Sequence, residues 1–525
     1  MENLNSKKNP RRGVYRWHGI LGILTVIPVI LWTCSGLSHP FMAHYFKVDV
    51  AHEFMEPSPI NKTQILLTPI DILKQNKIQS LRNFRMVEFN GTTFYQLKDH
   101  RNDLAYYSAA TGNVLHGGDG LYAEFLARYF LGDSISKVTS IEKITDFTDQ
   151  YKYVNRYLPV WKVSFKRKDK MDIYVETGQS RLANYNDNNR KAFLWIFGNF
   201  HSYEWLAKIT NNTFRYIVLL ILAAIIIGST ISGLVVYGFM WKKFRKPVKG
   251  GQKLGFLRRN HRLIGIAVSF VTLSFIGSGA YHATRKFNPD DRVKYVFEPE
   301  IKASGLIMSP EKLPIDWKLV FNISLAKINE KSYYQVFTMQ AGNDTWKKQQ
   351  VDRAEAMFGE KKAAKPNVSY YDTATGEILK DGVMEHVYSL VKHFVAQGAA
   401  DGQAACCEMM ANIAVDRSAP LNIISTDYLV KFDKEYGFIN KRLPVVKFAL
   451  NTPSHLTYYV EPSTGRLAAR VEDGDRREGF SFALFHKFFL VDFAGKNIRD
   501  LVTVISALGV LVVSILGLVL FLRIK

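Results

Sequence analysis

An apolar stretch with a histidine at each end occurs twice in this chain, and it constrains the fold more than any other feature. The first copy runs from His18 to His39 and the second from His261 to His282. Both histidines shift by the same 243 positions, so the copies align without an insertion. Each copy spans 21 positions, which is about 31 Å of α-helix and close to the thickness of a bilayer hydrocarbon core. The pattern therefore predicts two matched transmembrane helices with an imidazole near each membrane face.

Four stretches of the chain lack Asp, Glu, Lys and Arg, and each is long enough to cross a membrane as a helix. They are residues 17–46, 216–241, 263–284 and 501–522. The first is longer than the apolar core of a signal peptide, and its second copy lies in the middle of the chain. We therefore interpret it as an uncleaved anchor.

Most of the net charge of +22 lies in three short segments. These are the start of the chain, the connection between the second and third spans, and the last three residues. All three fall on one side of a four-span topology, as the positive-inside rule requires. This distribution argues against a nucleic-acid partner. It predicts a multi-pass protein of a bacterial inner membrane with both termini in the cytoplasm and two large periplasmic segments.

The expected architecture is a four-span helical bundle, duplicated internally as 2+2, with two periplasmic α+β lobes. We divide the chain as follows: N-terminus 1–16, first span 17–40, first lobe 41–212, second span 213–240, basic loop 241–262, third span 263–284, second lobe 285–499, fourth span 500–522 and tail 523–525.

Both lobes have the pattern of short strands and turns, and the second repeats the first. Residues 106–115 align with 370–379, and residues 173–182 align with 458–467. Within residues 173–182 a strand is followed by a turn, and we expect Gly178 to supply the positive φ of that turn. The second lobe also carries two polar insertions, residues 342–366 and 397–416. The whole unit of span, lobe and span is thus duplicated.

Six of the 13 histidines pair across the duplication. The pairs are His18 with His261, His39 with His282, and His201 with His486. Neutral imidazole is a good ligand for iron, and a haem with two imidazole ligands takes one from each of two opposed helices. Interfacial histidines also hydrogen-bond lipid headgroups, but six paired positions favour ligation. No carboxylate or cysteine lies at zinc-ligand spacing beside them in both copies.

Other residues bear on the kind of haem. No Cys-x-x-Cys-His sequence is present, which excludes covalent c-type haem attachment. Arg16 and Arg259 flank the cytoplasmic histidines and are candidates to pair with haem propionates, although positive-inside bias explains them equally well. The adjacent Cys406 and Cys407 have no assigned role.

The sequence resembles the PepSY-associated transmembrane helix family. The matching features are His-Gly-Ile-Leu-Gly from residue 18 opening a span, Ser-Gly closing it, Tyr-Tyr-x-x-x-Thr-Gly strands outside, and Phe-His before the returning span. The resemblance covers residues 11–240 and 255–523. It implies PepSY-like lobes and a likeness to haem-containing siderophore-iron reductases and iron-regulated inner-membrane proteins. Such reductases hold two b-type haems, so the resemblance implies four ligands among the six histidines.

We therefore expect an inner-membrane oxidoreductase that passes electrons outward through haem and reduces periplasmic ferric chelates, a siderophore-iron reductase. No dinucleotide-binding glycine pattern is present in the cytoplasmic parts, so the donor is a membrane quinol or a separate cytoplasmic reductase. The alternative is a non-enzymatic periplasmic binding or peptidase-modulating protein whose PepSY-like lobes contact partners.

Overall fold

The structure is a computed structural model that describes residues 10–46, 48–239, 251–287, 295–339, 367–406, 420–437 and 440–524. Its contacts divide the chain into two compact units. The helical unit comprises residues 1–47, 188–289 and 474–525, and the β-rich unit comprises residues 48–187 and 290–473. The insertion at 342–366 and Cys407 lie outside the described residues.

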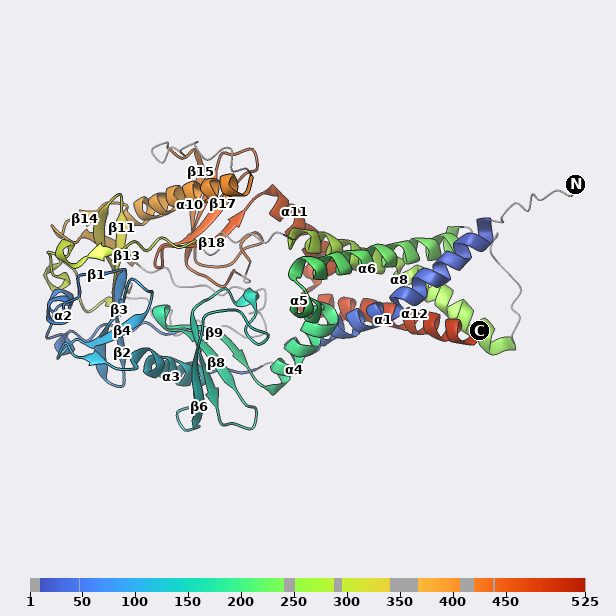
Figure 1. Cartoon of the computed structure of the whole chain (residues 1–525), viewed down its shortest axis with the longest axis horizontal. Coiled ribbons are helices and arrows are strands. Elements are labelled where there is room, and N and C mark those ends of the chain that lie inside the picture. The colour runs from blue at the N-terminus through green and yellow to red at the C-terminus, as the bar shows by residue number, and fades with distance from the viewer. Residues whose placement is uncertain are drawn as a thin grey trace, which may run out of the picture. The chain divides into compact units, whose positions relative to one another are not determined.

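The helical unit is a bundle of four long helices, shown side by side in Figure 1. They are α1 (Pro10–His44), α6 (Asn212–Gly233), α8 (Gly251–Arg285) and α12 (Lys496–Ile524). Each contacts two others, because α1 and α8 both pack against α6 and α12. All four are long and apolar enough to cross a membrane. The prediction of four membrane-spanning helices in a bundle is therefore confirmed.

The helices extend beyond the expected spans at several ends. The apolar helical segments run over Gly13–Met42, Asn212–Gly238, Gly255–Arg285 and Lys496–Arg523. Part of the expected basic loop is thus the first turns of α8. The physical reason is that a helix continues past the last apolar residue, since its charged ends reach water without breaking its backbone hydrogen bonds.

Two short helical segments belong to the helical unit and correspond across the duplication. In the first copy α4 (Asn188–Ile196) runs into a π-helical turn, Phe197–His201, and is followed by α5 (Glu204–Ile209). In the second, α11 (Asp473–Ser481) runs into the π-helical turn Phe482–His486. The first turn packs against α1 and the second against α8. These segments were expected within the lobes, and the structure instead assigns nearly all of them to the bundle.

The β-rich unit repeats one arrangement of sheet, helix and sheet. The first copy contains β2 (Asn83–Phe89), β3 (Thr92–Lys98), β4 (Leu104–Ser108), β5 (Val114–Leu115), α3 (Gly118–Leu131), β6 (Val138–Ile144), β7 (Val160–Phe165), β8 (Asp172–Glu176) and β9 (Arg181–Asn186). The second contains β11 (Val320–Ile328), β12 (Lys331–Thr338), β13 (Asn367–Asp372), β14 (Ile378–Leu379), α10 (Gly382–Cys406), β15 (Ile423–Leu429), β16 (Val445–Leu450), β17 (Thr457–Glu461) and β18 (Arg466–Val471).

Each four-stranded sheet is antiparallel with its strands in chain order. Helix α3 packs against β7 and β8, and α10 contacts β11, β13 and β17 (Figure 1). Two further short elements are α2 (Pro69–Gln75) and the pairing of β1 (Ser80–Leu81) with β10 (Ile301–Lys302). The strand pattern and the duplication expected from the sequence are both present in this unit.

The two expected lobes are joined into one unit, because their first sheets share a core. Buried side chains such as Phe84 and Tyr95 from the first repeat pack in one cluster with Tyr334 and Val336 from the second. At the seam, Asn83 Oδ1 accepts a hydrogen bond from the Leu325 amide at 2.8 Å. Its counterpart Asn322 does the same for the Met86 amide at 3.3 Å. This reciprocal pairing follows the duplication.

The expected positive φ at Gly178 is wrong. Residues 177–179 form a 3₁₀ turn, and the left-handed conformation falls on Ser180, with φ 52°. The equivalent position in the second repeat is Gly465, with φ 58°. The turn therefore needs its left-handed residue one step after the 3₁₀ segment, and only the second copy has glycine there.

A buried carboxylate joins the second sheets of the two repeats. Glu461 is fully buried, and its oxygens lie 2.5 Å from Arg181 Nη2 and 2.8 Å from Arg442 Nη1. Burial alone raises the pKa of Glu461, but the two guanidinium groups outweigh it and hold the pKa at about 2. Because Arg181 belongs to the first repeat, this cluster is an ionic bond between the repeats.

Replacing Glu461 with Gln is expected to destabilise the β-rich unit by about 3–5 kcal/mol. The change removes the paired carboxylate of the buried Arg442 and leaves Arg181 with only Glu176, 3.8 Å away. Denaturant unfolding of the full chain in detergent measures this. Since folding lowers the pKa, the stabilisation is present above about pH 4.5 and is lost as the pH falls toward 2. The control is Glu472→Gln, whose partly exposed pair with Arg470 is worth about 1 kcal/mol or less. Equal losses in both variants would contradict the prediction.

Candidate functional site

His18 and His261 approach one another inside the bundle. His18 is on α1 and His261 is on α8, and their ring centroids are 6.4 Å apart at an angle of 50°. Two imidazoles on opposite sides of one metal ion, each bound through a bond of about 2 Å, have ring centroids about 6 Å apart. The observed separation fits one metal ion held between the two rings.

Both rings are oriented by backbone carbonyls of the neighbouring helices. His18 Nδ1 lies 3.0 Å from the carbonyl oxygen of Ser229 on α6, and His261 Nδ1 lies 3.1 Å from that of Val513 on α12. A carbonyl can only accept, so Nδ1–H is the donor in each ring. Nε2 of each neutral imidazole then keeps its lone pair, which is the arrangement found in metal-ligating histidines.

Two glycines make room for these rings. A Cβ added to Gly233 would lie 2.9 Å from His18 Cε1, and one added to Gly517 would lie 3.1 Å from His261 Cε1. Both distances are shorter than ordinary carbon contacts. Tyr237 packs edge-on against both imidazoles, with centroid distances of 5.6 Å and 6.2 Å. The glycines therefore let each imidazole lie directly against the backbone of the adjacent helix.

His201 and His486 repeat this arrangement at the ends of the two π-helical turns. His201 Nδ1 donates to the Trp32 carbonyl oxygen at 3.3 Å and lies 3.2 Å from Ser35 Oγ. His486 Nδ1 donates to the Phe275 carbonyl oxygen at 3.2 Å and lies 3.3 Å from Ser278 Oγ. In both copies the hydrogen bond again leaves Nε2 free.

The surroundings of this second pair are also duplicated. Phe197 stacks on His201 with ring centroids 4.4 Å apart, and Phe482 stacks on His486 with ring centroids 4.5 Å apart. Burial lowers the pKa of His201 to about 4 and that of His486 to about 3. His201 also contributes to the lowered pKa of His486. Both imidazoles are neutral at physiological pH, as metal binding requires.

His39 and His282 do not share this arrangement. Both rings pack against the phenylalanine that begins the π-helical turn, His39 against Phe197 and His282 against Phe482. His282 Nδ1 also lies 2.5 Å from a carboxylate oxygen of Glu478, whereas His39 packs against the ring of Phe193. Phe193 and Glu478 occupy equivalent positions, so the two copies diverge at this point. Of the six predicted histidines, the structure therefore places four in one repeated environment and leaves this third pair outside it.

The two arginines predicted to flank the site do not have a repeated environment of this kind. Arg16 and Arg259 are both exposed, and neither has a hydrogen bond or ion pair with another described residue. Arg262 instead donates Nε–H to the carbonyl oxygen of Tyr237 at 3.0 Å, and so holds the segment that contacts both imidazoles. The sequence analysis did not single out Arg262 for this role, because it is one of many cations in a basic segment.

In the part of the chain that the structure describes, no three His, Cys, Asp or Glu side chains gather into a site that could hold a metal ion on protein ligands alone. The histidines come in twos, which suits a metal that brings further ligands of its own. In comparisons with known proteins, no family model matches the chain and no curated protein matches it. The functional argument therefore rests on the residues and their geometry.

Proposed function

We propose that the chain is an inner-membrane b-type haem protein that moves electrons across the membrane and reduces periplasmic ferric chelates, such as ferric siderophores. The observation that carries the proposal is the environment shared by four histidines. In each, Nδ1 is bound to a backbone carbonyl, and Nε2 has no hydrogen bond with a described residue. Two haems with two imidazole ligands each need four such groups.

The pairs we propose are His18 with His261 and His201 with His486. The first two histidines lie toward the basic start of α1 and α8. Ser35 and Ser278, which contact the second pair, lie some 17 residues further along each helix. By the positive-inside rule the first pair is on the cytoplasmic side and the second on the periplasmic side. One pair thus serves each leaflet.

A haem bound at each pair supplies a one-electron iron couple. The chain's own residues do the rest. The carbonyls of Ser229, Val513, Trp32 and Phe275 fix the orientation of the rings, and Gly233 and Gly517 admit them. The aromatic and aliphatic side chains around the imidazoles would limit the access of water, and together with the four histidines they would set the potential of a bound haem.

Ferric chelates are the proposed acceptors because of the chemistry of iron release. Hard oxygen donors, such as those of siderophores, bind Fe(III) far more tightly than Fe(II), so reduction weakens the complex. The PepSY-like character of the β-rich unit and its periplasmic placement are part of this proposal. The donor is a membrane quinol or a separate cytoplasmic reductase.

Protein purified from haem-replete cells is expected to be red, with the reduced α-band of b-type haem. Single His→Ala changes at residues 18, 261, 201 and 486 should each remove about half of the bound haem, because each destroys one of two bis-imidazole sites. His39→Ala and His282→Ala are the matched controls and should keep the full haem content. Haem per protein and reduced-minus-oxidised spectra measure this.

Colourless wild-type protein would exclude the haem proposal and favour the alternative of a non-enzymatic binding protein. Equal haem loss in all six variants would contradict the assignment of four ligands. Ferric-chelate reduction with a chemical donor provides a second readout, which should fall with the haem content.

Gly233→Ala is expected to displace the His18 ring, because the added Cβ would lie 2.9 Å from its Cε1. The variant should lose haem from one site only, or keep it with a changed spectrum. Gly238→Ala is the matched control, since a Cβ there meets no atom within 4 Å. Identical spectra for wild type and Gly233→Ala would show that this glycine does not support the ligand.

A further inference from the structure

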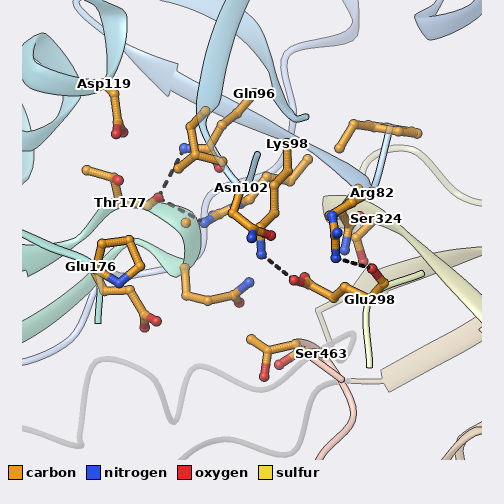
Figure 2. A pocket seen from close by; sticks show the side chains of 18 of the residues that line it. Arg82, Gln96, Lys98, Asn102, Asp119, Glu176, Thr177, Glu298, Ser324 and Ser463 are labelled. Atoms are coloured by element: carbon orange, nitrogen blue, oxygen red, sulfur yellow. Dashed lines mark hydrogen bonds and ion pairs between the residues drawn. The ribbon is translucent and has the colours of Figure 1, made fainter. Parts of the chain in front are cut away.

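The β-rich unit contains a cavity of about 260 Å³ that is lined by residues of both repeats. This is slightly below the usual range for small-molecule sites, roughly 300–1,000 Å³, so it suits a small ligand. Figure 2 shows Arg82, Lys98 and Glu298 together, with Glu176 and Thr177 across the cavity. The charged lining residues are Arg82, Arg85, Lys98, Lys143, Arg466, Asp119, Glu176 and Glu298.

Several of these charges are already matched. Lys98 is paired with Glu298, and Lys143 lies 2.7 Å from Asp103. Asp119 accepts hydrogen bonds from Tyr106 and from Trp161 at 2.9 Å and 2.7 Å. These groups form the wall of the cavity and leave little charge for a ligand.

The three arginines are different, because none forms an ion pair with a described carboxylate. Arg85 donates only to Ser180 Oγ at 2.9 Å and to the Thr177 carbonyl at 3.4 Å, and its Nε–H has no partner among the described residues. Arg82 donates to the carbonyl of Glu298, and its Nε–H is likewise buried and unpaired within the described ranges. Burial lowers the pKa of Arg85. A buried cation without a counter-ion is costly, so these groups favour an anion in the cavity.

Arg466 shows why the cavity exists at this place. Its equivalent in the first repeat, Arg181, forms an ion pair with Glu461, with Nη2 2.5 Å from a carboxylate oxygen. If the duplication were exact, Arg466 would form the equivalent ion pair with Glu176. No such ion pair forms, and both residues line the cavity instead. Glu176 Oε2 instead lies 3.8 Å from Arg181 Nη1, and it accepts no hydrogen bond from a described residue.

The unpaired groups define the chemistry of a ligand. Guanidinium groups bind carboxylates through paired N–H donors. Gln96 Oε1 is buried, and Glu176 Oε2 lies 3.8 Å from Arg181 Nη1, but neither oxygen accepts a hydrogen bond from a described residue. Both can therefore accept one from a donor such as a ligand hydroxyl. We propose that this cavity binds a small hydroxycarboxylate anion, with its carboxylates on Arg82, Arg85 and Arg466 and its hydroxyl directed to Glu176 or Gln96. The proposal does not depend on haem.

Isothermal titration of the full chain in detergent with iron-free citrate tests the proposal. Citrate should bind saturably at one site, and Arg466→Gln should weaken binding about tenfold or more, because a charge-assisted hydrogen bond is lost. Arg470→Gln is the matched control on the same strand, outside the cavity, and should bind like the wild type. Arg82→Gln provides a second cavity variant if Arg466→Gln fails to fold.

Two other ligands separate the possible sources of affinity. Tricarballylate, which is citrate without the hydroxyl, should bind several-fold more weakly, since buried acceptors would remain unpaired. Inorganic phosphate should bind more weakly than citrate. No binding of citrate, equal binding of phosphate, or an effect of Arg470→Gln as large as that of Arg466→Gln would each overturn the proposal.

Discussion

The hydrogen bond from an imidazole Nδ1 to a carbonyl of the neighbouring segment is the interaction on which the candidate site of the helical unit depends. Inside an apolar bundle an imidazole has few partners, and a helical carbonyl still offers its second lone pair. Accepting that bond costs the helix nothing, but it fixes both the tautomer and the rotation of the ring. The unprotonated Nε2 then points away from that carbonyl, and no carboxylate is needed to orient the ring.

Comparison of the two repeats explains why this hydrogen bond forms at four of the six paired histidines. His18 and His261 meet equivalent residues, Ser229 and Val513, through their backbones, so the side chains there are free to differ. The ring of His282 is instead held by the side chain of Glu478, which the other copy replaces with Phe193. The carbonyl contacts are thus kept in both repeats even where the side chains differ, whereas the contact between His282 and Glu478 depends on a side chain that the first repeat lacks.

The difference between local sequence patterns and contacts made in the folded chain also determines what could be predicted from the sequence. The four spans, the repeated strands and the six paired histidines follow from apolar length, alternation and a constant offset, which are local properties. The sequence could not separate His39 and His282 from the other four, because the separation depends on which helix carbonyl faces each ring. It also could not show that the lobes share a core, since Phe84 and Tyr334 look like ordinary strand residues. The positive φ at Ser180 was missed because nearby Gly178 gave a stronger turn signal.

The two candidate sites use the duplication in opposite ways, and the difference follows from the ligands proposed for them. A metal ion that takes two imidazole ligands would need the same group from each repeat, so matched residues from the two repeats would hold it. A small hydroxycarboxylate has no such symmetry, and a site for it must break the repeat. The cavity does so at two points: Arg85 stands where the second repeat has Ser324, and Arg466 is left apart from Glu176 although Arg181 and Glu461 are joined. Closing that second ion pair would neutralise Arg466 and leave only Arg82 and Arg85 as cations of the cavity without a described carboxylate partner.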